Sequence, residues 1–223
     1  MNKVGYILEQ IPSVKESFIA TEIEAMQRCG HQVQAFVLQS SSLTHWQQQL
    51  EMQKSAVYLS NYGDKFALSA LIKLQPKLFK ILAIAVKQQV MSVQKLLIEG
   101  LKLAHVVEQQ RCSHLHAYQS QYAVFIAIVA ARICGISVSF SGCDDDICQP
   151  ANDLAIRLNA ADFAVADCLD MAWYFQNIAP EANTSLIYRG IDCSERRGST
   201  RHSRRAARSD RSGACLHPGF HSS

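Results

Sequence analysis

The chain of 223 residues has 48% hydrophobic and 18% charged side chains, which are values of a globular protein with one sizeable core. Its net charge of +3 is unevenly spread, because residues up to Cys193 include 15 basic and 17 acidic ones, and the remainder includes 7 basic and 2 acidic ones. The body is therefore −2 and the tail +5, which argues against a basic nucleic-acid-binding face on the folded part.

The first apolar run, residues 4–8, is too short for a signal peptide and is soon followed by Pro12. We therefore expect the fold to begin with this run. Eight cysteines are scattered along the chain without any C-x-x-C pair. This usage favours reduced thiols in a cytosolic protein over disulfides or a zinc site.

A strand–helix–strand unit is predicted for the first forty residues. Residues 4–8 form a β-type run, residues 16–28 carry apolar side chains at helical spacing up to Cys29-Gly30, and residues 33–38 form the next β run. A polar stretch (39–53), a short strand (56–59) and a helix-rich region (65–107) follow, with Pro76 as a helix break or start. Parallel strands joined in this way need helices packed on the sheet.

The second half repeats the same alternation of strands and helices. The pattern predicts strands at 113–117, 137–140, 163–166 and 185–188, and helices at 121–134, 152–159 and 169–177. Such alternation predicts an α/β fold with a Rossmann-like, doubly wound parallel sheet. We assign residues 1–193 to this domain.

The residues from 194 to 223 differ sharply in composition from the body. They are rich in Arg and Ser, contain no Lys and hold almost no large apolar residue, so they cannot build a core. One interpretation is a nucleic-acid-binding or membrane-binding arm. We favour the other interpretation, a disordered tail read out of frame, because the strand pattern stops where a fold should continue.

Five motifs resemble those of bacterial family 4 glycosyltransferases of the exopolysaccharide and colanic-acid type, and they occur in the same order. The first motif is the opening segment 11–33, which has Lys-Glu-Ser-Phe in place of the family's Ser-Glu-Thr-Phe and ends with Gly-His-x-Val. The second combines His-x-His-Ala at 114–117 with Ala-Ala-Arg-x-x-Gly-Ile at 130–136. The other three are Ser-Phe-Ser-Gly-Cys-Asp at 139–144, Ala-Ala-Asp at 160–162 and Ile-Tyr-Arg-Gly-Ile-Asp at 187–192. The resemblance spans about residues 4–192.

This resemblance implies a set of candidate site residues at the carboxyl ends of strands. The family usually has a His in the segment that corresponds to residues 138–147, where this chain has Ser141 or Cys143. The family's acidic residue in this segment corresponds to Asp144 or Asp146. The candidates are Asp144 and His116 as catalytic residues, and Ser13, Glu16, Ser17, Ser141 and Arg189 as acceptor or cleft residues. Helix capping explains the serines near residue 16 equally well.

No metal site is predicted. Two His at alternate strand positions are more often packed or solvated than ligands, and adjacent Asp side chains do not converge on one ion. The resemblance implies transfer without a divalent metal and without a cofactor, the nucleotide sugar being a substrate.

The resemblance implies the N-terminal half of a GT-B glycosyltransferase, which moves a sugar from a nucleotide-sugar donor to a saccharide or lipid-linked acceptor. Because no donor half follows residue 192, the chain is expected to be inactive alone and to need a separate donor-domain chain. An alternative is a non-catalytic acceptor-binding or partner module. A dinucleotide binder is disfavoured, since the first strand-to-helix turn lacks G-x-G-x-x-G.

A lysine-studded apolar stretch lies at residues 66–86, with Lys73, Lys77 and Lys80. Two interpretations stay open. A pair of core-packed helices explains the pattern, and so does peripheral contact with an anionic membrane on the cytoplasmic side, where a lipid-linked acceptor would be met. The lysines interrupt the run, so no transmembrane span is predicted.

Overall fold

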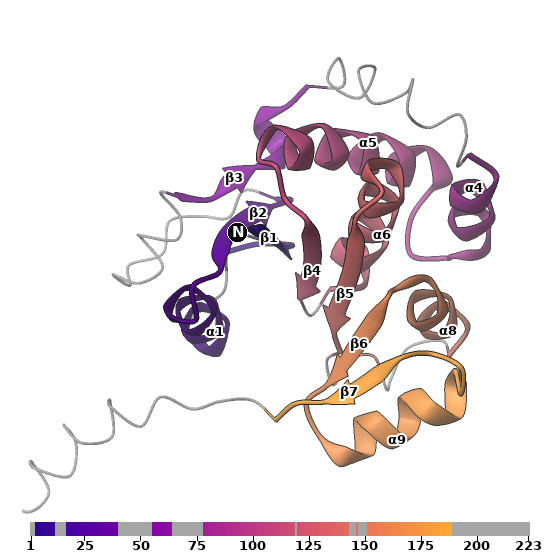
Figure 1. Cartoon of the computed structure of the whole chain (residues 1–223). Coiled ribbons are helices and arrows are strands. Elements are labelled where there is room, and N and C mark those ends of the chain that lie inside the picture. Colours follow the sequence, from indigo (N-terminus) through magenta and orange to yellow (C-terminus); the bar gives the residue numbers. More distant parts are fainter. Residues whose placement is uncertain are drawn as a thin grey trace, which may run out of the picture. The chain divides into compact units, whose positions relative to one another are not determined.

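A seven-stranded parallel sheet forms the centre of the described part of the chain (Figure 1). The computed structural model describes residues 3–11, 17–39, 55–63, 78–118, 120–142, 146 and 151–188. The strand order is β3-β2-β1-β4-β5-β6-β7. Successive strands are added toward one edge from β1 to β3 and toward the other edge from β4 to β7, and this change between β1 and β4 marks a doubly wound sheet. The predicted α/β, Rossmann-like fold class is thereby confirmed.

The strands lie close to their predicted positions. They are β1 (Lys3–Leu8), β2 (Gln32–Val37), β3 (Val57–Tyr58), β4 (His114–Tyr118), β5 (Ser137–Ser141), β6 (Phe163–Ala166) and β7 (Thr184–Leu186). The edge strand β3 is shorter than predicted, because the chain turns at once into a 3-10 turn, η2 (Leu59–Asn61), which Tyr62 closes by donating its N–H to the Leu59 carbonyl at 3.0 Å.

The helices follow the sequence pattern equally closely. They are α1 (Ser17–Arg28), α4 (Leu78–Lys87), α5 (Val93–Gln109), α6 (Gln121–Cys134), α8 (Ala151–Ala160) and α9 (Leu169–Ile178). Helix α6 has the same first and last residues as the predicted helix. Ser120 caps its start, and Gly135, at φ 73°, ends it in the left-handed conformation that glycine allows. None of the described helices combines the length and apolarity that crossing a membrane requires.

Alternate strand residues point to opposite sides and create two apolar layers. On one side, here called the α1 face, Tyr6 and Val37 of the sheet pack against Ile19 and Ile23 of α1. The other side, here called the α6 face, holds the larger core and packs against α5, α6, α8 and α9. The closest helix pair there is α5 and α6, where Gly100 leaves room for Val129.

Several predicted segments lie outside the described residues. These are the start of the first helix, most of the polar stretch 39–53, the part of the helix-rich region around Pro76, and the tail 194–223. Within the described part of the helix-rich region, α4 and α5 bear out the prediction.

Candidate functional site

The carboxyl ends of β1 and β4 meet where the strand order reverses. The chain leaves β1 toward α1 on one face of the sheet and leaves β4 toward α6 on the other. In open α/β sheets this divergence leaves a crevice at the strand ends, and ligands bind there. The residues just after β1, β4 and β5 therefore form the candidate site.

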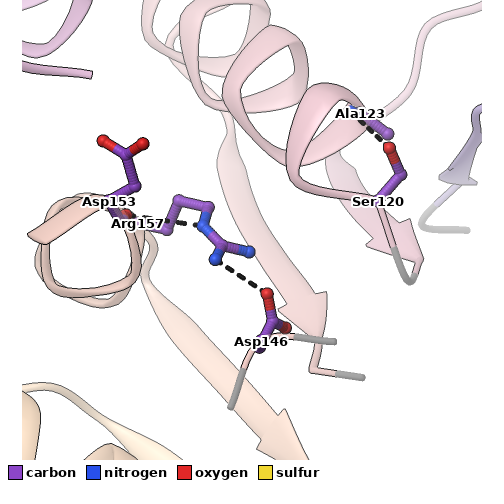
Figure 2. A network of polar contacts seen from close by, with 5 residues as sticks. All are labelled: Ser120, Ala123, Asp146, Asp153 and Arg157. Atoms are coloured by element: carbon purple, nitrogen blue, oxygen red, sulfur yellow. Dashed lines mark hydrogen bonds and ion pairs between the residues drawn. The ribbon is translucent and has the colours of Figure 1, made fainter. Parts of the chain in front are cut away.

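Glu9 directly follows β1 at this switch point, and the sequence analysis did not predict it as a site residue. Its carboxylate accepts a hydrogen bond from the Ser120 hydroxyl and another from Gln39 Nε2 at 3.2 Å. Ser120 in turn caps α6, since its Oγ accepts from the Ala123 N–H at 3.3 Å (Figure 2). The sequence feature that could have predicted Glu9 is an acidic residue placed immediately after a buried strand.

Two histidines of β4 and three serines of β5 form a continuous hydrogen-bonded row on the sheet, here called the His–Ser ladder. Each member is hydrogen-bonded to the next in the order Ser137, His114, Ser139, His116, Ser141. The four distances are 2.7, 2.7, 2.8 and 3.1 Å. The parallel register makes this possible, because His114 pairs with Ser137 and His116 with Ser139.

The ladder runs from the amino end of the strands to their carboxyl end. Ser137 is exposed, Ser139 is fully buried, and Ser141 is 9% exposed at the carboxyl end of β5. Gly142 follows, and a Cβ there would lie 2.5 Å from the Phe175 ring and 2.7 Å from Met171 Sδ. A glycine is therefore needed for β5 to end so close to α9.

Burial determines the charge of the two histidines. Desolvation lowers the pKa of His116 from 6.5 to about 3, and the neighbouring His114 adds to the effect. Desolvation also lowers the pKa of His114, against the opposing attraction of Asp162. Both rings are thus neutral at pH 7, and each presents one N–H and one lone pair.

A second polar pair lies beside the ladder on the α1 face. The Tyr6 hydroxyl donates to Glu22 Oε1 of α1 at 2.7 Å, and the Tyr6 ring centroid lies 5.1 Å from that of His116. Desolvation by burial, followed by the neighbouring Glu22 charge, raises the pKa of Tyr6. Tyr6 therefore stays a hydrogen-bond donor at neutral pH.

A buried ion pair anchors the chain after β5. Arg157 of α8 donates from Nη2 to Asp146 Oδ1 at 2.7 Å, and both side chains are 2% exposed or less. The Arg157 Nε also donates to the Asp153 backbone carbonyl at 3.4 Å (Figure 2). Asp146 is thus held in an ion pair, and Asp144, the other acidic candidate, lies outside the described residues.

The structure describes only some of the predicted site residues. His116 and Ser141 are brought together by the ladder, and Ser17 is the first residue of α1. Ser13, Glu16, Asp144 and Arg189 lie outside the described residues. His116 reaches the carboxyl edge through Ser141, because both of its ring nitrogens are taken by serine hydroxyls.

Two other features of the described residues bear on ligand binding. Over the described ranges, no group of three or more His, Cys, Asp or Glu side chains could hold a metal ion. A cavity of about 430 Å³ lies between α4, the last turn of α6 and α8, with Lys80, Lys87 and Arg132 in its wall. Because α6 ends there, this cavity is at the amino edge of the sheet and is separate from the candidate site.

The strand order defines an open, doubly wound α/β domain of Rossmann-like fold, and solved structures of low sequence identity share this fold. No family model and no curated protein matches the sequence. The fold class is therefore shown by structural likeness.

Three solved structures resemble the chain at low sequence identity. HepE from Anabaena, solved in complex with UDP-glucose, is 14% identical with a TM-score of 0.53, over 86% of this chain and 45% of HepE. A sucrose-phosphate synthase structure from Thermosynechococcus elongatus is 10% identical with a TM-score of 0.52, over 92% and 99%. MnaA from S. aureus, solved with UDP, is 12% identical with a TM-score of 0.51, over 84% and 43%. The chain thus spans less than half of HepE and of MnaA.

Proposed function

We propose that the chain is the acceptor-side half of a family 4 glycosyltransferase, in which a sugar passes from a nucleotide-sugar donor to a saccharide acceptor in polysaccharide synthesis. The observation that carries the proposal is the position of the motif residues. The motif segments that contain the candidate residues lie at the start of α1 and at the ends of β4, β5 and β7, around one edge of the sheet, whereas the motifs at 130–136 and 160–162 lie at its amino edge. In this reading residues 1–193 are the domain, and 194–223 are a tail outside it.

The position of Glu9 supports the acceptor side over the donor side. The N-terminus of a helix attracts anions such as phosphate, through its free N–H groups and its dipole. Here the Glu9 carboxylate lies at the start of α6 and is bound to the capping Ser120. A diphosphate would be repelled by this carboxylate, whereas a sugar hydroxyl can donate to it. The diphosphate is therefore assigned to a separate donor-domain chain.

Asp144 is the proposed catalytic residue, acting on the hydroxyl of the acceptor. The ion pair of Asp146 with Arg157 fixes the chain two residues further on, and Ser141 fixes it three residues before. Asp144 stands between these two residues in the sequence, and general-base catalysis by a carboxylate contributes typically about 10²–10⁴-fold to a rate. Ser13, Glu16, Ser17, Ser141 and Arg189 are proposed as acceptor-contacting residues, and His116 acts through Ser141.

The test is sugar transfer from a panel of nucleotide sugars to a lipid-linked saccharide extract. We expect no turnover by the purified chain alone and turnover after addition of a GT-B donor-domain chain. In that mixture Asp144→Asn should lower kcat about 10²-fold or more. Asp145→Asn is the matched control and should stay near the native rate. Turnover by the chain alone, or equal losses in both variants, would contradict the assignment.

The non-catalytic alternative keeps the same crevice and the same ligand. If the chain is an acceptor-binding or partner module, the saccharide extract binds, but no donor-domain chain restores transfer. The burial of His116, whose two ring nitrogens both bond to serine hydroxyls, is the observation that favours this alternative, because the ring does not itself reach a proton of the acceptor.

We further propose that α4 contacts the anionic inner face of the membrane, where a lipid-linked acceptor is found. Phe79 and Val86, two turns apart on α4, are 88% and 69% exposed. Lys80 and Lys87 follow them one residue later and line the cavity beside Arg132. Exposed apolar side chains flanked by lysines are typical of helices that lie in a membrane interface.

Hydrogen exchange measured by mass spectrometry tests this contact and separates it from binding by the basic tail. We expect phosphatidylglycerol vesicles, but not phosphatidylcholine vesicles, to slow exchange in the α4 peptide. Lys80→Glu with Lys87→Glu should weaken this protection by about tenfold in vesicle concentration or more, since each basic side chain contributes about 1 kcal/mol. Lys95→Glu with Arg111→Glu is the control on exposed positions. Protection confined to the tail peptide would refute the contact.

A further inference from the structure

Ser139 is the centre of the His–Ser ladder and couples its two halves. Its Oγ lies 2.7 Å from His114 Nε2 and 2.8 Å from His116 Nδ1, and the residue is completely buried. A hydroxyl has one hydrogen to donate. It can therefore donate to one of these nitrogens only, and the other nitrogen must then carry a hydrogen and donate to Ser139.

Counting hydrogens along the ladder leaves two arrangements in which every buried member is satisfied. In the first, Ser139 donates to His116 Nδ1, so both histidines carry their hydrogen on Nε2 and His116 donates to Ser141. In the second, Ser139 donates to His114 Nε2, so both histidines carry their hydrogen on Nδ1 and Ser141 donates to His116. A mixed arrangement leaves a buried group of the ladder without a partner, which is disfavoured.

The two arrangements give Ser141 opposite properties at the carboxyl edge of the sheet. In the first, the Ser141 oxygen accepts from His116 and its own hydrogen is available to a ligand. In the second, the hydrogen is used on His116 and the lone pairs of Ser141 are available to accept. A saccharide hydroxyl can both donate and accept, whereas a phosphate oxygen can only accept. Because Ser141 can either donate or accept a hydrogen bond, it is better matched to a saccharide hydroxyl than to a phosphate oxygen.

We propose that Ser141 contacts a hydroxyl of the saccharide ligand, and that the His–Ser ladder sets whether Ser141 donates or accepts in this contact. His116 and Ser139 are then positioning residues, since they act through Ser141. The choice of a saccharide as ligand rests on the proposed function. The coupling between the two histidines rests only on the distances within the ladder.

Long-range proton–nitrogen NMR of the ¹⁵N-histidine-labelled chain tests the coupling, because a ring nitrogen that carries a hydrogen resonates far from one with a lone pair. The expected result is the same tautomer in His114 and His116, or equal tautomer populations if both arrangements are present. Variants His114→Gln and His116→Gln assign the signals. Opposite tautomers, or unequal populations, would overturn the proposal.

Replacing single serines shows where the coupling resides. Ser139→Ala removes the shared hydroxyl, so the two histidine populations should separate as temperature or solvent is changed. Ser137→Ala is the matched control at the exposed end, where water can replace the hydroxyl, and it should leave the populations equal. If Ser139→Ala does not fold, the equality of tautomers in the native chain and in Ser137→Ala still decides.

The oligosaccharide released by mild acid from the lipid-linked extract is the ligand probe. We expect it to shift both histidine populations by the same amount in the native chain, and to shift neither histidine in Ser141→Ala. A shift of His116 alone, or of neither histidine in the native chain, would overturn the proposal. This readout needs no donor and no turnover. Its failure is therefore distinct from failure of the transfer assay, which would refute the proposed function instead.

Discussion

Replacement of Arg157 by Leu is expected to lower the free energy of unfolding by about 3–5 kcal/mol, because it removes the guanidinium that is paired with the buried Asp146 carboxylate. The two side chains are 1% and 2% exposed, so water cannot take over the ion pair. The guanidinium also lies over the Phe140 ring, with 5.7 Å between its central carbon and the ring centroid. Urea unfolding followed by circular dichroism measures the loss.

Two controls separate the buried charge from the lost packing. The double variant Arg157→Leu with Asp146→Leu removes both charges and should recover most of the stability, since apolar replacement of a whole buried pair is often neutral. Arg28→Leu breaks the Glu24 pair at an Arg side chain that is 73% exposed, and it should change stability by about 1 kcal/mol or less. A double variant as unstable as the single one would mean that packing dominates.

Acid is expected to destabilise the chain strongly through His116. The unfolded residue takes up a proton near pH 6.5, while burial holds the pKa of the folded residue at about 3. Unfolding therefore takes up a proton between these values, so stability is fully present above pH 6.5 and falls as the pH drops toward 3. The loss is on the order of 3–5 kcal/mol, since one pKa unit corresponds to about 1.4 kcal/mol.

The measurement is the free energy of unfolding of the native chain and of His116→Gln at a series of pH values from 7 to about 3. Glutamine can bond to the ladder serines but does not titrate, so the difference between the two chains isolates this residue. That difference should shrink as the pH falls. His31→Gln, at an exposed position, should leave the curve parallel to the native one. Parallel curves for His116→Gln would contradict the predicted pKa effect.

The amino-acid sequence by itself determined the elements of the fold and the class to which they belong. Apolar periodicity and end residues are local properties, and for this reason α6 was predicted to the residue and β6 likewise. The alternation of such segments sufficed for a doubly wound sheet. His116, Ser141 and the acidic run after β5 became candidates through the resemblance of their motifs to a glycosyltransferase family, and not through this alternation.

Only the tertiary structure decided how those residues are used. The ladder depends on the register of β4 against β5, and the pairing of His114 with Ser137 joins residues 23 positions apart. Glu9 meets Ser120 across 111 positions, and Arg157 pairs with Asp146, one of three consecutive aspartates. Such pairings follow from the packing of distant segments, which no local periodicity encodes. The burial that neutralises His116 has the same origin.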